Sequence, residues 1–68
     1  MTPKEKAIKV IIEIRKQEDK AYNQANFCRE HKFMLEASKF DAIEESLRKV
    51  CRMLENEFET GYISIHNQ

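Results

Sequence analysis

Residues 40–58 read FDAIEESLRKVCRMLENEF, and this stretch carries the clearest amphipathic pattern of the chain. Its apolar residues recur at steps of three and four: Phe40, Ile43, Leu47, Val50, Cys51, Leu54 and Phe58. Glutamate, lysine and arginine occupy the opposite face. Because residues three and four apart share one face of an α-helix, the pattern predicts a helix over about 39–59 with one buried side.

A second pattern precedes this one. Residues spaced alternately by four and three are Ala7, Ile11, Ile14, Glu18, Ala21, Ala25, Cys28, Lys32 and Leu35. Neither glycine nor proline interrupts residues 4–60, and both are the usual helix breakers. Thr2, Pro3 and Glu5 form a typical helix start, since Thr2 can accept a backbone hydrogen bond and Pro3 suits the first helical position. Gly61 is typical of a helix end. The sequence therefore predicts a first helix over 3–35.

The two stripes do not continue in one register, so a turn must separate the helices. Ser38 to Asp41 resembles a helix-capping sequence, which places the predicted turn near residues 35–41. The resulting fold class is all-α, an antiparallel two-helix hairpin over residues 1–60, followed by a short extended or disordered tail over 61–68.

Two alternatives remain open at this stage. A break near residues 23–26 would give three helices. Residues 9–15 are rich in β-branched apolar side chains, and residues 62–66 alternate as a strand does, so these two segments could pair. The helix start just upstream of residues 9–15 favours the helical interpretation.

Composition narrows the classes of function. With 68 residues and two cysteines, the chain is one small domain without a disulfide framework, and such domains often need a second chain for sufficient burial. Twelve basic and twelve acidic residues give zero net charge, whereas nucleic-acid binding favours a basic excess. The longest apolar run, residues 10–12, is too short for a transmembrane helix. No signal peptide is recognisable, so we expect a cytoplasmic protein with reduced thiols.

The sequence contains more apolar residues than the interface between two helices can bury. Between residues 8 and 14 the expected helix is apolar over most of its circumference. We expect these residues, with parts of the second stripe, to join copies into a dimer or higher oligomer, or to bind another protein. The predicted interface residues are Ile8, Val10, Ile11, Ile12, Ile14, Tyr22, Phe27 and Met34.

Glu18 interrupts the first stripe with a carboxylate, which on an apolar face needs a partner. Arg15, Tyr22 and Arg29 lie one turn or more away along the expected helix. These four residues are the candidate polar ligand site, which could hold a small anionic molecule between subunits. The simpler interpretation is an ion pair of Arg15 with Glu18 on the helix surface.

The cysteines and histidines carry weaker signals. Cys28 and His31 share one helix face, and Cys51 with His66 could complete four zinc ligands, but the spacing matches no zinc pattern. A turn near residue 39 would bring Cys28 level with Cys51. We expect no metal, no cofactor and no catalytic residue, because no nucleophile motif or glycine-rich phosphate loop occurs.

The sequence thus predicts a small non-enzymatic helical interaction protein, a regulator or inhibitor that binds a partner protein. In architecture alone, it resembles the short helical hairpins of bacterial regulators and phage-encoded inhibitors. A small nucleic-acid-binding regulator is the first alternative, and an oligomer that sequesters a small anionic ligand is the second.

Overall fold

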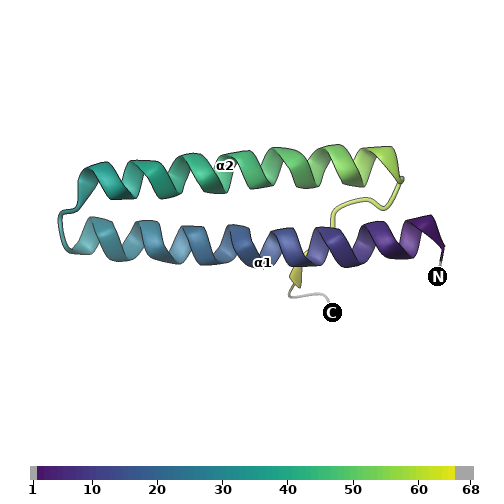
Figure 1. The fold of residues 1–68 in the computed structure, drawn as a ribbon, viewed down its shortest axis with the longest axis horizontal. Helices are drawn as coiled ribbons and strands as arrows, with labels where there is room; N and C mark the ends of the chain where they lie inside the picture. Colours follow the sequence, from purple (N-terminus) through teal and green to yellow (C-terminus); the bar gives the residue numbers. More distant parts are fainter. Residues whose placement is uncertain (1, 66–68) are drawn as a thin grey trace.

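The computed structural model describes residues 2–65 as two α-helices packed side by side in an antiparallel hairpin (Figure 1). Helix α1 spans Pro3–Glu30 and helix α2 spans Met34–Glu57. The predicted all-α two-helix hairpin is confirmed. Helix α1 passes through residues 23–26 and through residues 9–15 without a break, so the three-helix and strand alternatives are wrong.

The first turn of α1 forms as its sequence predicts. Thr2 Oγ1 accepts a hydrogen bond from the backbone N–H of Glu5 at 3.1 Å, and Pro3 is the first helical residue. The hydroxyl thereby satisfies one of the backbone donors that have no partner within a helix start.

The turn between the helices lies at residues 31–33, not at 35–41 as predicted. Lys32 adopts the left-handed conformation, with φ 62°. The Phe33 N–H donates to Cys28 O at 2.7 Å and the Lys32 N–H donates to Arg29 O at 3.1 Å. This bond pair is the Schellman motif, which closes a helix with backbone groups alone. The candidate cap at Ser38 is not used, because that residue lies inside α2.

Helix α2 ends by the same device, two residues before the predicted limit of 59. Glu59 is left-handed with φ 53°, and the N–H groups of Thr60 and Glu59 donate to Glu55 O and Asn56 O. Gly61 also has a positive φ of 70°, but it follows the cap instead of forming it. At the C-terminal end of each helix, a charged residue therefore occupies the left-handed position in which glycine is usual.

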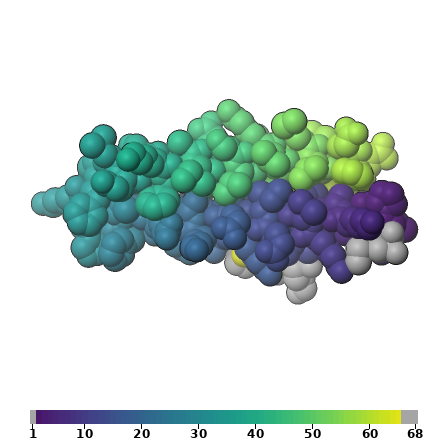
Figure 2. Space-filling view, in the orientation of Figure 1, coloured from purple at the N-terminus to yellow at the C-terminus, as the bar shows by residue number. Residues whose placement is uncertain are grey.

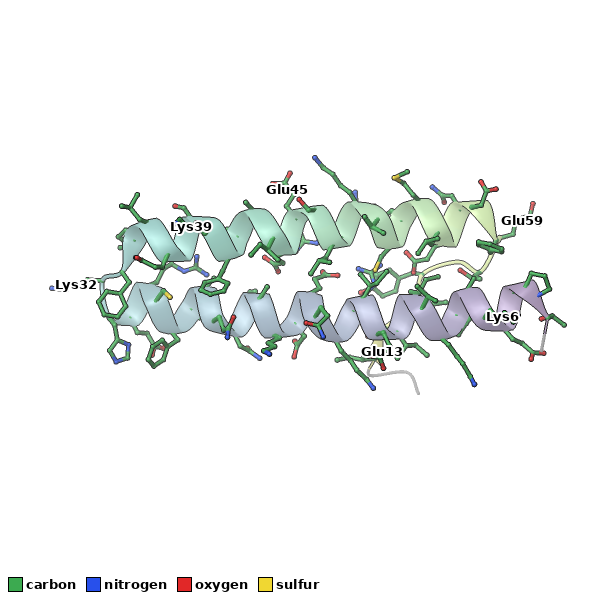
Figure 3. The ribbon with its side chains drawn as sticks, in the orientation of Figure 1. Lys6, Glu13, Lys32, Lys39, Glu45 and Glu59 are labelled. Atoms are coloured by element: carbon green, nitrogen blue, oxygen red, sulfur yellow. The ribbon has the colours of Figure 1, made fainter. Side chains whose placement is uncertain are left out.

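Replacing Lys32 with glycine should raise the free energy of unfolding by up to about 1 kcal/mol. The left-handed conformation costs a residue with a Cβ roughly 1–2 kcal/mol, and the greater backbone entropy lost by glycine offsets part of that relief. The side chain of Lys32 lies at the tip of the hairpin (Figure 3), so few contacts are lost.

Urea denaturation followed by circular dichroism would measure this change. Ser38→Gly is the matched control, since the same type of substitution inside α2 should lower stability by about 0.5–1 kcal/mol. A loss of stability in Lys32→Gly would contradict the expectation.

The interface between the helices follows the predicted first stripe as far as Cys28. Ala7, Ile11, Ala21, Ala25 and Cys28 are buried, whereas Ile14 and Glu18 are half-buried. The predicted continuation is wrong, because Lys32 lies in the turn and Leu35 is 77% exposed. From α2, the buried residues are Ala37, Cys51 and Glu55.

This core is thin. Ile11 and Cys51 are the largest side chains that are fully buried, and most other buried apolar residues are alanines. Small side chains let two helices approach closely but remove little apolar area from water. Of the predicted α2 stripe, Ile43 and Val50 remain 48% and 42% exposed.

The chain turns back after α2, and the returning segment covers one side of the hairpin but not the other. In Figure 1 the segment after residue 58 passes behind α1, and contacts of Arg15 with Ile63 and Tyr62 fix its place there. In Figure 2 the two helices fill the side facing the viewer, and the tail shows only at the lower edge. Neither helix within residues 2–65 is long and apolar enough to cross a membrane.

Candidate functional site

The guanidinium of Arg15 is the centre of a buried polar cluster on the tail side. Arg15 is 7% exposed. Its Nη1 donates to Glu18 at 2.8 Å, its Nη2 donates to Glu55 at 2.9 Å, and its Nε donates to the carbonyl of Ile63 at 3.1 Å. All three guanidinium nitrogens are therefore engaged, and two of them donate to carboxylates.

The cluster continues along α2. The second oxygen of Glu18 accepts a bond from Arg48 Nε at 3.2 Å, and Arg48 Nη2 donates to Glu44 at 3.0 Å. Among the described residues, no buried side-chain nitrogen or oxygen lacks a hydrogen-bond partner. A network satisfied in this way fixes the register of the two helices. Sliding one helix along the other would separate the buried carboxylates from the guanidinium groups that pair with them.

The same cluster holds the tail through its backbone. Glu55 Oε2 accepts a bond from the N–H of Ile63 at 2.5 Å, while Arg15 Nε donates to the carbonyl of that residue. The Tyr62 ring lies 4.9 Å from the Arg15 guanidinium carbon, in a cation–π contact. The predicted tail of 61–68 extends past residue 65 and so lies partly outside the described residues.

Two groups in the cluster have shifted pKa values. Burial by itself would lower the pKa of Arg15, but its hydrogen bond to Glu18 and the nearby negative groups raise it above the ordinary value. Burial raises the pKa of the Cys51 thiol, with Arg15 acting in the opposite direction. Arg15 therefore stays charged and Cys51 stays protonated at neutral pH, which makes Cys51 a poor nucleophile.

The predicted ligand residues are brought together in part. Arg15, Glu18 and Tyr22 line one shallow hollow of about 240 Å³ on the tail side. The other lining residues are Asp19, Glu44, Tyr62, Ser64 and Ile65. Arg29 lies elsewhere, where its Nη1 donates to both carboxylate oxygens of Asp41 at 2.9 and 3.0 Å.

The charges around this hollow do not favour the predicted anionic ligand. Glu18, Asp19 and Glu44 contribute three carboxylates, whereas Arg15 contributes the one guanidinium of the lining. The hydrogen-bonding nitrogens of Arg15 are already occupied within the chain. Glu18 and Glu44 are themselves paired with Arg15 and Arg48, so these bonds explain the cluster as a structural lock.

The two cysteines lie far apart, contrary to the arrangement that the predicted turn implied. Cys51 is beside Ile11, whose carbonyl oxygen lies 4.0 Å from its sulfur, whereas Cys28 is near the turn. The rise of 1.5 Å per residue places Cys28 about 25 Å from Ile11 along α1. Both thiols are free.

The cysteines and histidines, whose spacing does not favour a zinc site, do not gather within the described residues. His31 lies at the tip, where its Nδ1 is 2.9 Å from the carbonyl of Phe27 and its ring stacks on that residue. His66 falls outside the described residues. Within residues 2–65, no three histidine, cysteine or acidic side chains gather as metal ligands would.

The predicted interface residues do not share one surface. Ile11 is fully buried inside the hairpin, and the other three isoleucines are half-buried. Val10, Tyr22, Phe27 and Met34 are 49–60% exposed. Tyr22 belongs to the hollow on the tail side, and Phe27 stacks on His31 near the turn. Of this set, Val10 and Ile14 occupy the side opposite the tail, as their helical spacing from the buried stripe requires.

We call that opposite side the open face. A groove of about 200 Å³ runs along it, lined by Gln17, Lys20, Ala21, Gln24, Phe40, Ile43 and Leu47. Val10 and Val50 extend the same rows by one heptad. The open face is thus defined by Val10, Ile14, Gln17, Ala21, Gln24, Phe40, Ile43, Leu47 and Val50.

Comparisons of the chain with protein-family models, with curated proteins and with solved structures give no match. A functional proposal therefore depends on the two sides of the hairpin described above. One side is closed by a satisfied polar cluster and the tail. The other is apolar and faces solvent.

Proposed function

We propose that the protein acts without catalysis, by binding another protein through the open face. One observation carries this proposal: both helices have exposed apolar residues on the side opposite the tail. Val10, Ile43 and Val50 are 42–50% exposed. The polar residues between them, Gln17 and Gln24, carry no charge, and Lys20 stands at the edge. A contiguous apolar surface of this kind is typical of a docking site.

The thin core supports the same proposal. A domain of 68 residues buries a small share of its surface, and four of the seven buried apolar residues here are alanines. An α-helical partner can pack against these helices, because the ridges of side chains on one helix fit into the grooves of another. A partner laid on the open face would bury the surface that the hairpin alone leaves in water.

The proposed mode of action is that of a regulator or inhibitor that covers a surface of its partner. The charged residues of the tail side are bonded to one another, which gives them a structural role. Two free thiols suit a reducing compartment, and we propose the cytoplasm as the location.

Affinity capture with three versions of the chain tests this proposal. Ile43→Glu places a carboxylate in the centre of the open face, and Leu35→Glu is the control at an exposed apolar site outside it. Burying an unpaired carboxylate costs several kcal/mol, so proteins captured by the native chain should fall by more than about tenfold with Ile43→Glu. Leu35→Glu should capture them as the native chain does.

Circular dichroism would show that both variants keep their helices. Equal capture by the native chain and Ile43→Glu would contradict the proposal. If a labelled duplex instead shifted in a salt-dependent manner with all three versions, the nucleic-acid-binding alternative would replace it.

A further inference from the structure

We infer that the pair of Arg15 and Glu55 is a binding site for an extended peptide segment of another protein, and that the chain's own tail occupies this site as an internal ligand. We call this pair the tail seat. It lies on the side opposite the open face, so the inference goes beyond the proposed function and does not depend on it. The contacts of Tyr62 and Ile63 show how a peptide binds there.

The tail seat holds both backbone groups of a single residue. Oε2 of Glu55 accepts a bond from the N–H of Ile63 at 2.5 Å, and Nε of Arg15 donates to the carbonyl of the same residue at 3.1 Å. One acceptor and one donor placed in this way are what a neighbouring β-strand offers to an extended chain. Because every residue except proline has both groups, these bonds do not depend on the side chain.

The tail seat is held in place by the helices and not by the tail. The other carboxylate oxygen of Glu55 accepts a bond from Nη2 of Arg15 at 2.9 Å, and Nη1 of Arg15 donates to Glu18 at 2.8 Å. These bonds remain when the tail leaves, whereas one oxygen and one N–H of the pair lose their partners. A peptide that restores both bonds would enter a site that is already oriented.

The tail that fills this site is itself poorly covered. Tyr62 is 75% exposed although its ring lies over the Arg15 guanidinium, and Ile63 is half-buried. The return of the chain also requires the left-handed conformation at Gly61, where glycine loses much backbone freedom. A competing peptide therefore has little buried area to displace.

A peptide from another protein has room for contacts that the tail does not make. The shallow hollow of about 240 Å³ is lined by Arg15 and Tyr22 of α1 and by Tyr62 and Ile65 of the tail. Tyr22 is 49% exposed, so a peptide side chain placed in this hollow would bury additional surface. The tail of a second copy already occupies its own tail seat, and an exchange of tails would form no contact that each copy lacks.

A labelled peptide of residues 60–65, blocked at both ends, tests this site by fluorescence anisotropy. Ile63→Pro in the full chain removes the N–H that binds Glu55, so it should release the tail. This chain should bind the peptide more than about tenfold more tightly than the native chain, in which the tail competes at a high effective concentration. Ile63→Val is the matched control, because it keeps the N–H and should bind the peptide as the native chain does.

Two altered peptides test the mode of binding to the Ile63→Pro chain. A peptide with Ile63→Pro lacks the N–H for Glu55, so its affinity should be more than about tenfold lower than that of the unaltered peptide. A peptide with Tyr62→Ala loses the exposed cation–π contact, so its affinity should fall about two- to fivefold. The NMR signal of the Arg15 Nε–H should move when the tail is released and return toward its native position when the unaltered peptide binds.

A second pair of variants opens the tail seat without altering Ile63. Gly61→Val adds a β-branched side chain at φ 70°, which is strained although no atom lies within 4 Å of the added Cβ. This chain should bind the peptide more tightly than the native chain. Gly61→Asn is its matched control, because asparagine tolerates the left-handed conformation, and it should bind as the native chain does. This pair decides the test if Ile63→Pro does not fold.

Three results would overturn the inference: no binding by either opened chain with its helices intact, equal binding by the native and opened chains, or equal affinity of the unaltered and Ile63→Pro peptides. Light scattering should give Gly61→Val the mass of the native chain. Twice that mass would mean that copies exchange tails, and would overturn the assignment to another protein. Adding Ile43→Glu to the Ile63→Pro chain should leave the peptide affinity unchanged, so the open face can fail as a binding site while the tail seat does not.

Discussion

Replacing Arg15 with alanine is expected to lower the free energy of unfolding by about 3–5 kcal/mol, the usual cost of breaking a buried ion pair by removing one partner. The guanidinium is 7% exposed and serves Glu18, Glu55 and Ile63 together. Its removal leaves the Glu55 carboxylate, which is 6% exposed, without its cation. The tail loses one of its two backbone bonds at Ile63 as well.

Urea denaturation at several protein concentrations would measure this loss. The double variant Arg15→Met with Glu55→Gln removes both charges, so it should lose less stability than Arg15→Ala, since no buried charge is left unpaired. This variant keeps the test informative even if Arg15→Ala does not fold. A loss below about 1 kcal/mol in Arg15→Ala, the range of exposed ion pairs, would show that the cluster contributes little.

Ile11→Ala should lower the free energy of unfolding by about 2–5 kcal/mol. Ile11 is fully buried next to Cys51, so removing its side chain leaves a cavity between the two helices. Ile11→Val should cost less, about 0.5–1.5 kcal/mol.

Leu35→Ala is the matched control for this substitution. Leu35 is 77% exposed, and surface substitutions of this kind change stability by less than about 0.5 kcal/mol. Thermal and urea unfolding of the three variants would rank them. Similar losses for Ile11→Ala and Leu35→Ala would contradict the thin core described here.

The sequence predicts the helices and the seam of α1 because these depend on spacing. Ala7, Ile11, Ala21 and Cys28 recur at helical steps, and their burial follows from that repeat. The helix start at Thr2 is likewise predictable, since its capping bond is local.

The turn could not be placed in the same way. Its bonds join backbone groups of Cys28, Arg29, Lys32 and Phe33, and those groups are the same in every residue. The left-handed position falls on Lys32 instead of a glycine, so no side-chain signal marks it. The misplaced turn then shifted the expected level of Cys51 against α1.

One part of the polar cluster, the pair of Arg15 and Glu18, was predictable from the sequence. Arg15 and Glu18 are one helical turn apart, and their pairing follows from that spacing. Glu55 and Ile63 come from distant parts of the chain, and a single sequence contains no signal that joins them. The open face was missed for a related reason, since a stripe shows which residues are apolar but not which side the tail will cover.

The seat of the tail has a consequence for the order in which the chain folds. It is made from Arg15 of one helix and Glu55 of the other, so it does not exist until the hairpin has closed. Hairpin closure brings together Arg15 and Glu55, which are 40 residues apart in sequence, and the tail can bind only to that assembled pair. Docking of Ile63 is therefore the last step of assembly and the first contact to open when the protein begins to unfold.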